Sequence, residues 1–164
     1  ASGGDNISLV RRAAVDALHK FGGGKGVTQA LAKALKDANT HVRVIAASSL
    51  ARIGPPAREA TGALLDAARD EESDVRFSVM LALGAMGAEK GVVPTLVKAL
   101  RDDVASVRER AALALERIGG PAAEALPSLE KALKDESEPV RKQAASAIGK
   151  IRQEQRRSTQ PEVF

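Results

Sequence analysis

Cysteine is absent from this chain, and so are tryptophan and tyrosine. Without cysteine the chain can form no disulfide, hold no thiolate-bound zinc and use no cysteine nucleophile. The only aromatic residues are three phenylalanines, so a core must be built mainly from alanine, leucine, isoleucine and valine. Alanine has the highest helix propensity and lets helix axes approach closely. This composition therefore predicts an all-α fold.

Histidine and long apolar runs are also scarce. The two histidines, His19 and His41, are far apart, and neither has a nearby carboxylate at a spacing suited to metal binding. No apolar run approaches the roughly 18–20 residues that cross a bilayer. We therefore expect no catalytic residues, no metal, no cofactor and no membrane as a partner. The sequence predicts that the protein is not an enzyme.

A pattern of about 33 residues recurs along the chain, at a period typical of solenoid proteins. An arginine stands six positions after an aspartate, and successive copies of this arginine are 32, 33, 32 and 33 residues apart. The five pairs are Asp5/Arg11, Asp37/Arg43, Asp70/Arg76, Asp102/Arg108 and Asp135/Arg141. A valine precedes each arginine, and a glycine stands eleven positions after it in the first four copies. The recurrence predicts stacked structural units that share one continuous core.

Each copy predicts a pair of helices. The second helix runs from the valine–arginine pair to the glycine, with apolar residues at offsets 3, 4, 6, 7 and 10 from the arginine. Such spacing forms a stripe along one face of a helix. Thr40 and Ser73 stand where N-cap residues are expected, and the glycine is expected to supply a left-handed C-cap. The first helix of each copy ends at the aspartate.

The first copy begins at Asp5 and leaves no room for its first helix, so we expect nine helices, five inner and four outer. We interpret residues 1–4 as a linker or an expression scar. Residues 5–157 are predicted to form the repeat domain, and residues 158–164 a flexible tail. The incomplete first copy favours a fragment of a longer array over a chain in which another element covers the first helix.

The segment Asp-Glu-Ser-Glu-Pro-Val-Arg-Lys-Gln-Ala-Ala at 135–145, like its four counterparts, resembles the HEAT-repeat family, particularly the short-repeat branch of phycobilisome-lyase-like proteins. The resemblance covers roughly residues 5–152. It implies a right-handed α–α superhelix used mainly to bind other proteins, and it names no partner. The branch also suggests, as an alternative, an accessory subunit of a lyase-type or other enzyme. Deoxyhypusine hydroxylase, a HEAT-like metalloenzyme, has repeated His-Glu pairs that are absent here.

The repeated aspartates and arginines could serve either chemistry or structure. A catalytic site or a phosphate clamp is needed once, whereas these pairs occur in every copy. We therefore predict that each aspartate meets its own or the next repeat's arginine, together with amides at a helix start. The five pairs would then form an Asp–Arg ladder of charge-assisted hydrogen bonds that ties the turns together.

Two other patterns bear on nucleotide or nucleic-acid binding. Residues 22–28 superficially resemble a phosphate-binding loop, but no Ser or Thr follows the lysine directly and no strand precedes it, so a turn is the better interpretation.

A row of basic residues at offset 9 of the second helix could follow a nucleic-acid backbone. Cations near helix C-termini also complement the helix dipole. A nucleic-acid-binding module is therefore an alternative. The row consists of Lys20, Arg52, Arg117 and Lys150.

The candidate binding surface lies where the copies differ. Offsets 1, 5 and 8 of the second helix cluster within about 60° on the side opposite the core stripe. They are polar in the end copies and apolar in the middle, where Phe77 and Leu81 lie one turn apart. We predict that a helix or peptide of another protein binds in this concave groove; the alternative is that Phe77 and Leu81 fill the core. The predicted groove residues are Val44, Ile45, Phe77, Leu81, Leu113, Glu109, Glu116 and Lys142.

Overall fold

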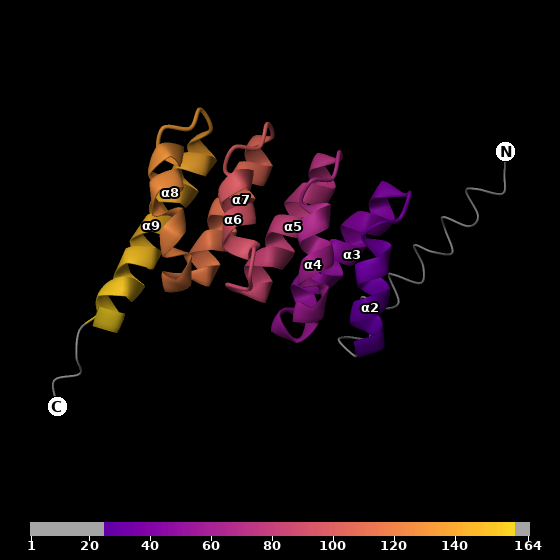
Figure 1. The fold of residues 1–164 in the computed structure, drawn as a ribbon. Coiled ribbons are helices and arrows are strands. Elements are labelled where there is room, and N and C mark those ends of the chain that lie inside the picture. The colour runs from indigo at the N-terminus through magenta and orange to yellow at the C-terminus, as the bar shows by residue number, and fades with distance from the viewer. Residues whose placement is uncertain (1–24, 160–164) are drawn as a thin grey trace, which may run out of the picture. The chain divides into compact units, whose positions relative to one another are not determined.

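The computed structural model describes residues 25–159 of the chain, and these residues contain eight α-helices, two 3-10 helices and no β-strand (Figure 1). The chain divides into two units, residues 1–86 and 87–164, and each unit is described by itself. The first copy of the repeat, with Asp5 and Arg11, lies outside the described residues. The remaining four copies each contribute two α-helices, as the sequence predicts.

The described part of unit 1, residues 25–86, contains two helical hairpins. The first pairs α2 (Lys25–Ala34) with α3 (Thr40–Ile53), and the second pairs α4 (Thr61–Ala67) with α5 (Ser73–Met86). The 3-10 helix η1 (Pro55–Ala60) joins the two hairpins. The second helices, α3 and α5, pack along each other, while α2 contacts η1 and α4. The second helices therefore form one layer of the unit and the first helices another.

Unit 2 repeats this arrangement. Its hairpins are α6 (Val92–Ala99) with α7 (Ala105–Ile118), and α8 (Leu126–Ala132) with α9 (Glu138–Thr159), joined by the 3-10 helix η2 (Gly120–Ala125). α7 and α9 pack along each other, and α6 contacts α7 and η2. The proline-containing segments η1 and η2 explain why α4 and α8 are only seven residues long.

The apolar stripes of the second helices form the core, as their spacing predicts. In α7 the buried apolar residues are Val107, Ala111, Ala112, Ala114 and Leu115, all at most 2% exposed. Full burial of a leucine side chain contributes about 1.5–3 kcal/mol. The alanines contribute less apolar area but allow neighbouring helix axes to approach closely. The buried core of residues 25–159 is therefore built from aliphatic side chains and methionine, without an aromatic ring.

Glycines end the second helices with positive φ angles. The amides of Gly54 and Gly119 donate to the carbonyls of Leu50 and Leu115, each at 3.0 Å. Their φ angles are 69° and 70°, but their ψ angles of −142° and −139° lie outside the left-handed helical region. At Gly54 and Gly119 the expected left-handed cap is therefore wrong in detail. This backbone region is essentially restricted to glycine, so the requirement for glycine is stricter than expected.

The N-cap of α3 is Asn39 rather than Thr40. The Oδ1 of Asn39 accepts hydrogen bonds from the amides of His41 and Val42 at 2.9 and 3.4 Å. Thr40 is the first residue of α3, and Ser73 is the first residue of α5. Asp37 fixes the position at which α3 begins. Its Oδ1 accepts a hydrogen bond from the amide of Asn39 at 2.8 Å and closes the turn before the helix. The expected cap residues therefore lie one position inside their helices.

α9, the second helix of the last repeat, is longer than the second helices of the other described repeats. It spans 22 residues against 14 in α3, α5 and α7. Arg152 replaces the glycine at which those helices end, and α9 continues to Thr159, two residues past the predicted domain end at residue 157. Glu154 in this extension accepts the Gly120 amide at 2.7 Å and pairs with Lys150 at 2.7 Å. The hydrogen bond from Lys150, followed by that from Gly120, lowers the pKa of Glu154.

Candidate partner-binding clefts and the Asp–Arg ladder

Arg43 joins the two hairpins of unit 1. Its Nε and Nη2 donate to Oδ2 and Oδ1 of Asp70 at 2.7 and 3.0 Å. Its Nη1 donates to the carbonyls of Asp37 and Ala38 at 2.8 and 3.3 Å. The side chains of Arg43 and Asp70 are only 10% and 11% exposed. A two-pronged, charge-assisted contact of this kind fixes geometry as well as adding stability.

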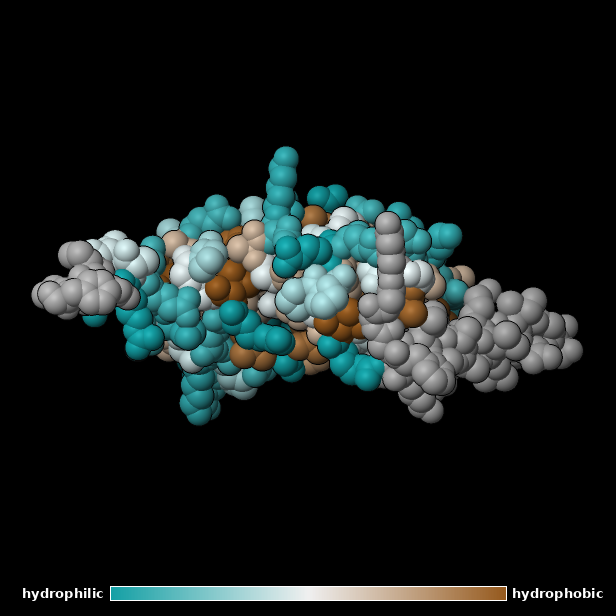
Figure 2. Space-filling view, turned by 90° about the horizontal axis from the view of Figure 1, so that it is seen from below, coloured by the Kyte–Doolittle hydropathy of each residue, from teal (hydrophilic) through white to brown (hydrophobic). Residues whose placement is uncertain are grey.

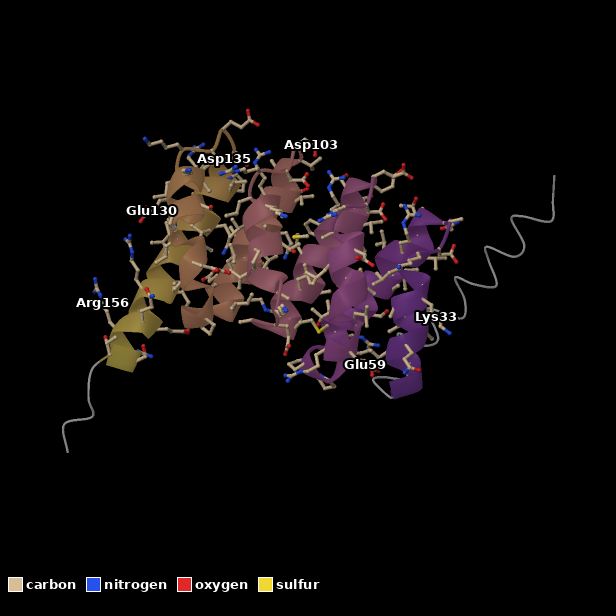
Figure 3. All side chains as sticks on the ribbon, viewed as in Figure 1. Lys33, Glu59, Asp103, Glu130, Asp135 and Arg156 are labelled. Atoms are coloured by element: carbon tan, nitrogen blue, oxygen red, sulfur yellow. The ribbon has the colours of Figure 1, made fainter. Side chains whose placement is uncertain are left out.

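Arg108 makes the same contacts in unit 2. Its Nε and Nη2 donate to Oδ2 and Oδ1 of Asp135 at 2.8 and 2.9 Å. Its Nη1 donates to the carbonyls of Asp102 and Asp103 at 2.9 and 3.2 Å. Asp103 and Asp135 lie at the same end of the hairpins (Figure 3). The contact therefore ties together the turn before α7 and the turn before α9.

Each aspartate also organises its own turn. Its Oδ1 accepts the amide two residues later: in addition to the Asp37 contact described above, Asp70, Asp102 and Asp135 do this at 2.9–3.0 Å. The arginine of the same repeat binds the aspartate's main-chain carbonyl, as Arg76 does at 2.9 Å and Arg141 at 2.7 Å. The carboxylates of Asp70 and Asp135 thus pair with the arginine of the preceding repeat. From the sequence we expected each aspartate to pair with the arginine of its own or the next repeat. The sequence does not show toward which neighbouring turn the guanidinium group extends.

The ladder perturbs the titration of its members. The hydrogen bond from Arg108 lowers the pKa of Asp135, the Ser137 amide lowers it further, and burial opposes both. The hydrogen bonds to Asp70 and Asp135 raise the pKa of Arg43 and Arg108 respectively. A carboxyl with a lower pKa in the folded than in the unfolded state stabilises the fold above its unfolded pKa of about 3.9. This stabilisation is lost as the pH falls through the lower, folded-state pKa.

We expect the free energy of unfolding of the Asp135→Asn variant to fall less steeply with decreasing pH than that of the wild type. The variant has no carboxylate to protonate at this position, so its free energy of unfolding is lower at neutral pH but converges with that of the wild type in acid. Urea unfolding between about pH 2 and pH 6 measures both profiles. Profiles that stay parallel over this range would show that the Asp135 carboxylate does not contribute through its charge.

Unit 1 has a cleft between its two second helices. The unit 1 cleft has a volume of about 410 Å³ and is lined by Thr40, His41, Val44, Asp74, Phe77 and Ser78. Val44 of α3 and Phe77 of α5 are both half-buried and both line the cleft. The hydroxyl of Ser78 donates to the Asp74 carbonyl of its own helix at 2.9 Å. The cleft therefore combines an apolar surface with a histidine and a carboxylate.

Unit 2 has a cleft at the equivalent repeat positions, but its lining is charged. The unit 2 cleft has a volume of about 380 Å³ and is lined by Glu109, Glu138, Pro139, Lys142 and Gln143. Lys142 pairs with Glu138 at 2.6 Å, and both side chains are exposed. Nearby, Glu116 of α7 accepts hydrogen bonds from Gln143 and, at 2.7 Å, from Ser146. The two clefts share a position in the fold but differ in chemistry.

The predicted groove residues divide between the two units. Val44 and Phe77 line the unit 1 cleft, and Glu109 and Lys142 line the unit 2 cleft. The side chains of Ile45, Leu81 and Leu113 are half-buried and line neither cleft, and Glu116 is hydrogen-bonded to α9.

Phe77 and Leu81 are thus neither fully exposed nor part of the fully buried core. Hydrophilic side chains cover most of the face shown in Figure 2, and apolar side chains reach that surface in separate patches.

The sequence analysis missed His41 and Asp74 as cleft residues. Each stands three positions before a predicted groove residue, Val44 or Phe77, and so lies one helical turn earlier on the same face. This spacing is the signal that could have identified them. Their contribution matters because they place an imidazole ring and a carboxylate beside the apolar surface of the unit 1 cleft.

The other candidate patterns fall as follows. Arg52 and Arg117 of the basic row are exposed, and Lys150 pairs with Glu154 at 2.7 Å; Lys20 lies outside the described residues. Of the segment resembling a phosphate loop, Lys25 begins α2, and the part before it is also outside the described residues.

Between residues 25 and 159, no group of His, Asp or Glu side chains is placed to hold a metal ion. No helix in that range is both long and apolar enough to cross a bilayer.

A family model of HEAT repeats matches residues 28–116 and 93–160. The chain belongs to the HEAT-repeat family. The family resemblance drawn from the sequence is therefore confirmed, as is the prediction of an all-α repeat fold. No curated protein matches the chain.

Solved structures with a similar fold include both binding proteins and enzymes. A designed armadillo repeat protein in complex with the peptide (KR)4 has a TM-score of 0.70 at 23% identity, covering 87% of this HEAT chain and 76% of that chain. The complex of CpcE and CpcF of phycocyanin lyase from Nostoc sp. PCC7120 has a TM-score of 0.72 at 22% identity, covering 93% and 62%. Human deoxyhypusine hydroxylase in complex with glycerol has a TM-score of 0.60 at 26% identity, covering 77% and 43%. This HEAT chain spans less than two thirds of either enzyme chain. The fold is of a kind typical of protein-binding scaffolds.

Proposed function

We propose that this HEAT chain is a non-enzymatic scaffold that binds a helix or peptide of another protein, with one apolar side chain of the partner seated in the unit 1 cleft. The observation that carries the proposal is the cleft itself, in which Val44 and Phe77 present apolar surface between α3 and α5. Binding energy at protein interfaces concentrates in such pockets, where an apolar side chain is removed from water. Amphipathic helices and peptides commonly bind in grooves of this kind.

Charge supports a partner that also carries basic residues. In unit 1, the carboxylate of Asp74 stands at the unit 1 cleft beside the apolar surface. In unit 2 the equivalent cleft is lined by Glu109 together with the Lys142–Glu138 ion pair, so Glu109 remains as a carboxylate for a basic side chain of the partner. The designed armadillo repeat protein of similar fold was solved with the basic peptide (KR)4. We therefore expect the partner segment to combine an apolar anchor with lysine or arginine, because opposite charges speed association and fix register.

The ladder supports a structural rather than a catalytic role for the most conspicuous acidic and basic groups. The carboxylates of Asp70 and Asp135 are each bound by two guanidinium nitrogens and one main-chain amide. A general base must be able to accept a proton from a substrate. These carboxylates instead hold the two clefts in place, which is the function we propose for them.

The experiment that tests the proposal is a selection of binders from a phage-displayed library of random peptides, with the intact chain as target. We expect enriched peptides to share a bulky apolar residue near lysine or arginine, and to bind the purified chain with measurable affinity by isothermal titration calorimetry. Enrichment of no sequence over an unrelated immobilised protein would contradict the proposal. So would enrichment of peptides that lack an apolar residue.

A further inference from the structure

The unit 1 cleft places a carboxylate, an aromatic ring and aliphatic surface beside one another. Asp74 and Phe77 both belong to α5 and stand three residues apart, so their side chains lie on the same face of the helix, about one turn apart. Both line the cleft, and Val44 of α3 adds apolar surface. A ligand group that satisfies all three residues carries positive charge, a flat face and an apolar stem.

The carboxylate of Asp74 is available to a ligand. Asp74 is exposed, and no hydrogen bond or ion pair from another described residue, within 25–159, reaches its carboxylate. The hydroxyl of Ser78 donates to the main-chain carbonyl of Asp74 instead. A purely apolar group placed against this carboxylate would remove water from it without supplying a donor, which costs free energy. The cleft therefore favours a partner that brings a hydrogen-bond donor to Asp74.

Arginine satisfies this set of residues better than lysine does. The guanidinium group is planar and weakly hydrated, so it stacks with its flat face on an aromatic ring while its edge donates two parallel hydrogen bonds to a carboxylate. The ammonium group of lysine is a strongly hydrated point charge, which loses more hydration against a ring such as that of Phe77. The methylene groups of an arginine stem also pack on apolar surface, which Val44 supplies here.

The unit 2 cleft does not repeat this arrangement. Counted from the ladder arginine, Pro139 and Lys142 hold the positions that Asp74 and Phe77 hold in unit 1. The described residues that line the unit 2 cleft include no aromatic ring. The carboxylate beside a ring is therefore a property of the unit 1 cleft and not a consequence of the repeat.

We propose that the unit 1 cleft selects its partner by one arginine, whose guanidinium stacks on Phe77 and donates two hydrogen bonds to the carboxylate of Asp74. The inference rests on the proposed function, because the arginine enters the cleft beside the partner's apolar anchor. The cleft volume of about 410 Å³ lies within the range of about 300–1,000 Å³ of pockets that hold drug-sized ligands, so it has room for two side chains. Asp74 and Phe77 are then the residues that determine specificity.

Peptides from the phage selection test the choice of arginine. Each enriched peptide is synthesised with its arginine, with lysine in its place, and with citrulline, the neutral isostere of arginine. By calorimetry we expect lysine to weaken binding at least about fivefold and citrulline at least about tenfold, because citrulline removes the charge from the hydrogen bonds to Asp74. In nuclear magnetic resonance spectra of the complex, the arginine side-chain protons should shift upfield through the ring current of Phe77.

Two substitutions in the chain should remove the preference for different reasons. Asp74→Asn removes the charge and keeps the shape, so arginine and citrulline peptides should bind with similar affinity. Phe77→Leu keeps apolar surface but removes the ring, so the preference for arginine over lysine and the upfield shift should both disappear. Glu59→Gln, a control, neutralises an exposed carboxylate of η1 that does not line the cleft, and should leave the affinities unchanged. Circular dichroism checks that each variant is folded.

The possible results separate this inference from the proposed function. Equal affinities of the arginine and lysine peptides for the wild-type chain would overturn the inference and leave the apolar anchor in place. So would a preference for arginine that persists in both Asp74→Asn and Phe77→Leu, or enrichment of peptides that have an apolar residue but no arginine. Enrichment of no peptide at all would overturn the inference together with the proposed function.

Discussion

Replacing Arg108 with alanine should lower the free energy of unfolding by about 3 kcal/mol or more. The guanidinium is 8% exposed and its partner Asp135 is 11% exposed, so the substitution leaves a carboxylate that is shielded from water and has lost both guanidinium hydrogen bonds. The carbonyls of Asp102 and Asp103 also lose their donor. Urea unfolding followed by circular dichroism measures the effect. Arg117→Ala, an exposed arginine on the same helix, should cost about 0.5 kcal/mol or less.

A double-mutant cycle separates the contact from the individual residues. If Arg108 and Asp135 act together, the double variant with both replaced by alanine should be less destabilised than the sum of the two single variants. Arg43 and Asp70 should behave in the same way, because their geometry is the same within unit 1. Additive losses in both cycles, or a loss below about 1 kcal/mol for Arg108→Ala, would show that the ladder does not tie the hairpins together.

Replacing Phe77 with serine should weaken binding of a selected peptide at least about 30-fold. Loss of a central apolar side chain at an interface commonly costs 2 kcal/mol or more. Phe77 is half-buried and lines the unit 1 cleft together with Val44, so its removal takes away much of the apolar surface available to a partner. Calorimetry with wild-type and variant protein measures the change. Leu133→Ser makes a similar apolar-to-polar change away from the cleft and should leave peptide affinity unchanged.

The stability of the Phe77→Ser variant distinguishes a partner-binding role of Phe77 from a role in packing the core. The Phe77→Ser substitution does not alter the fully buried residues of α5, such as Val79 and Leu83, which form the core of this helix. We therefore expect the variant to stay folded and to lose affinity rather than cooperativity. Unfolding at a much lower temperature together with an unchanged peptide affinity would support core filling by Phe77 and would contradict the binding role.

The repeat itself could be predicted from the sequence because it depends on local spacing. The valine–arginine register placed the second helices, and the glycine positions placed the ends of α3 and α7. The segments η1 and η2 were not anticipated, because Pro55 and Pro121 act on the local backbone while the hydrophobic period stays helical. Pairing across the ladder could be expected, but its direction depends on which neighbouring turn the guanidinium reaches in space.

The candidate site could be predicted only in part. A helical wheel identifies the side of a helix that lies opposite its core, and so it identified Val44 and Phe77. It cannot determine how far two helices stand apart, which is why the half-burial of Phe77 and Leu81 required the structure. Nor does a helical wheel show contacts between helices, such as the hydrogen bonds from Ser146 and Gln143 to the carboxylate of Glu116.

Hydrogen exchange on the wild-type chain, with and without a selected peptide, tests most directly whether a partner binds between neighbouring second helices. Exchange at main-chain amides reports local protection along each helix. We predict added protection in the first turns of α3 and α5, around His41, Val44 and Phe77. Added protection confined to the first helices α2 and α4, or no change in α3 and α5 at saturating peptide, would contradict the account.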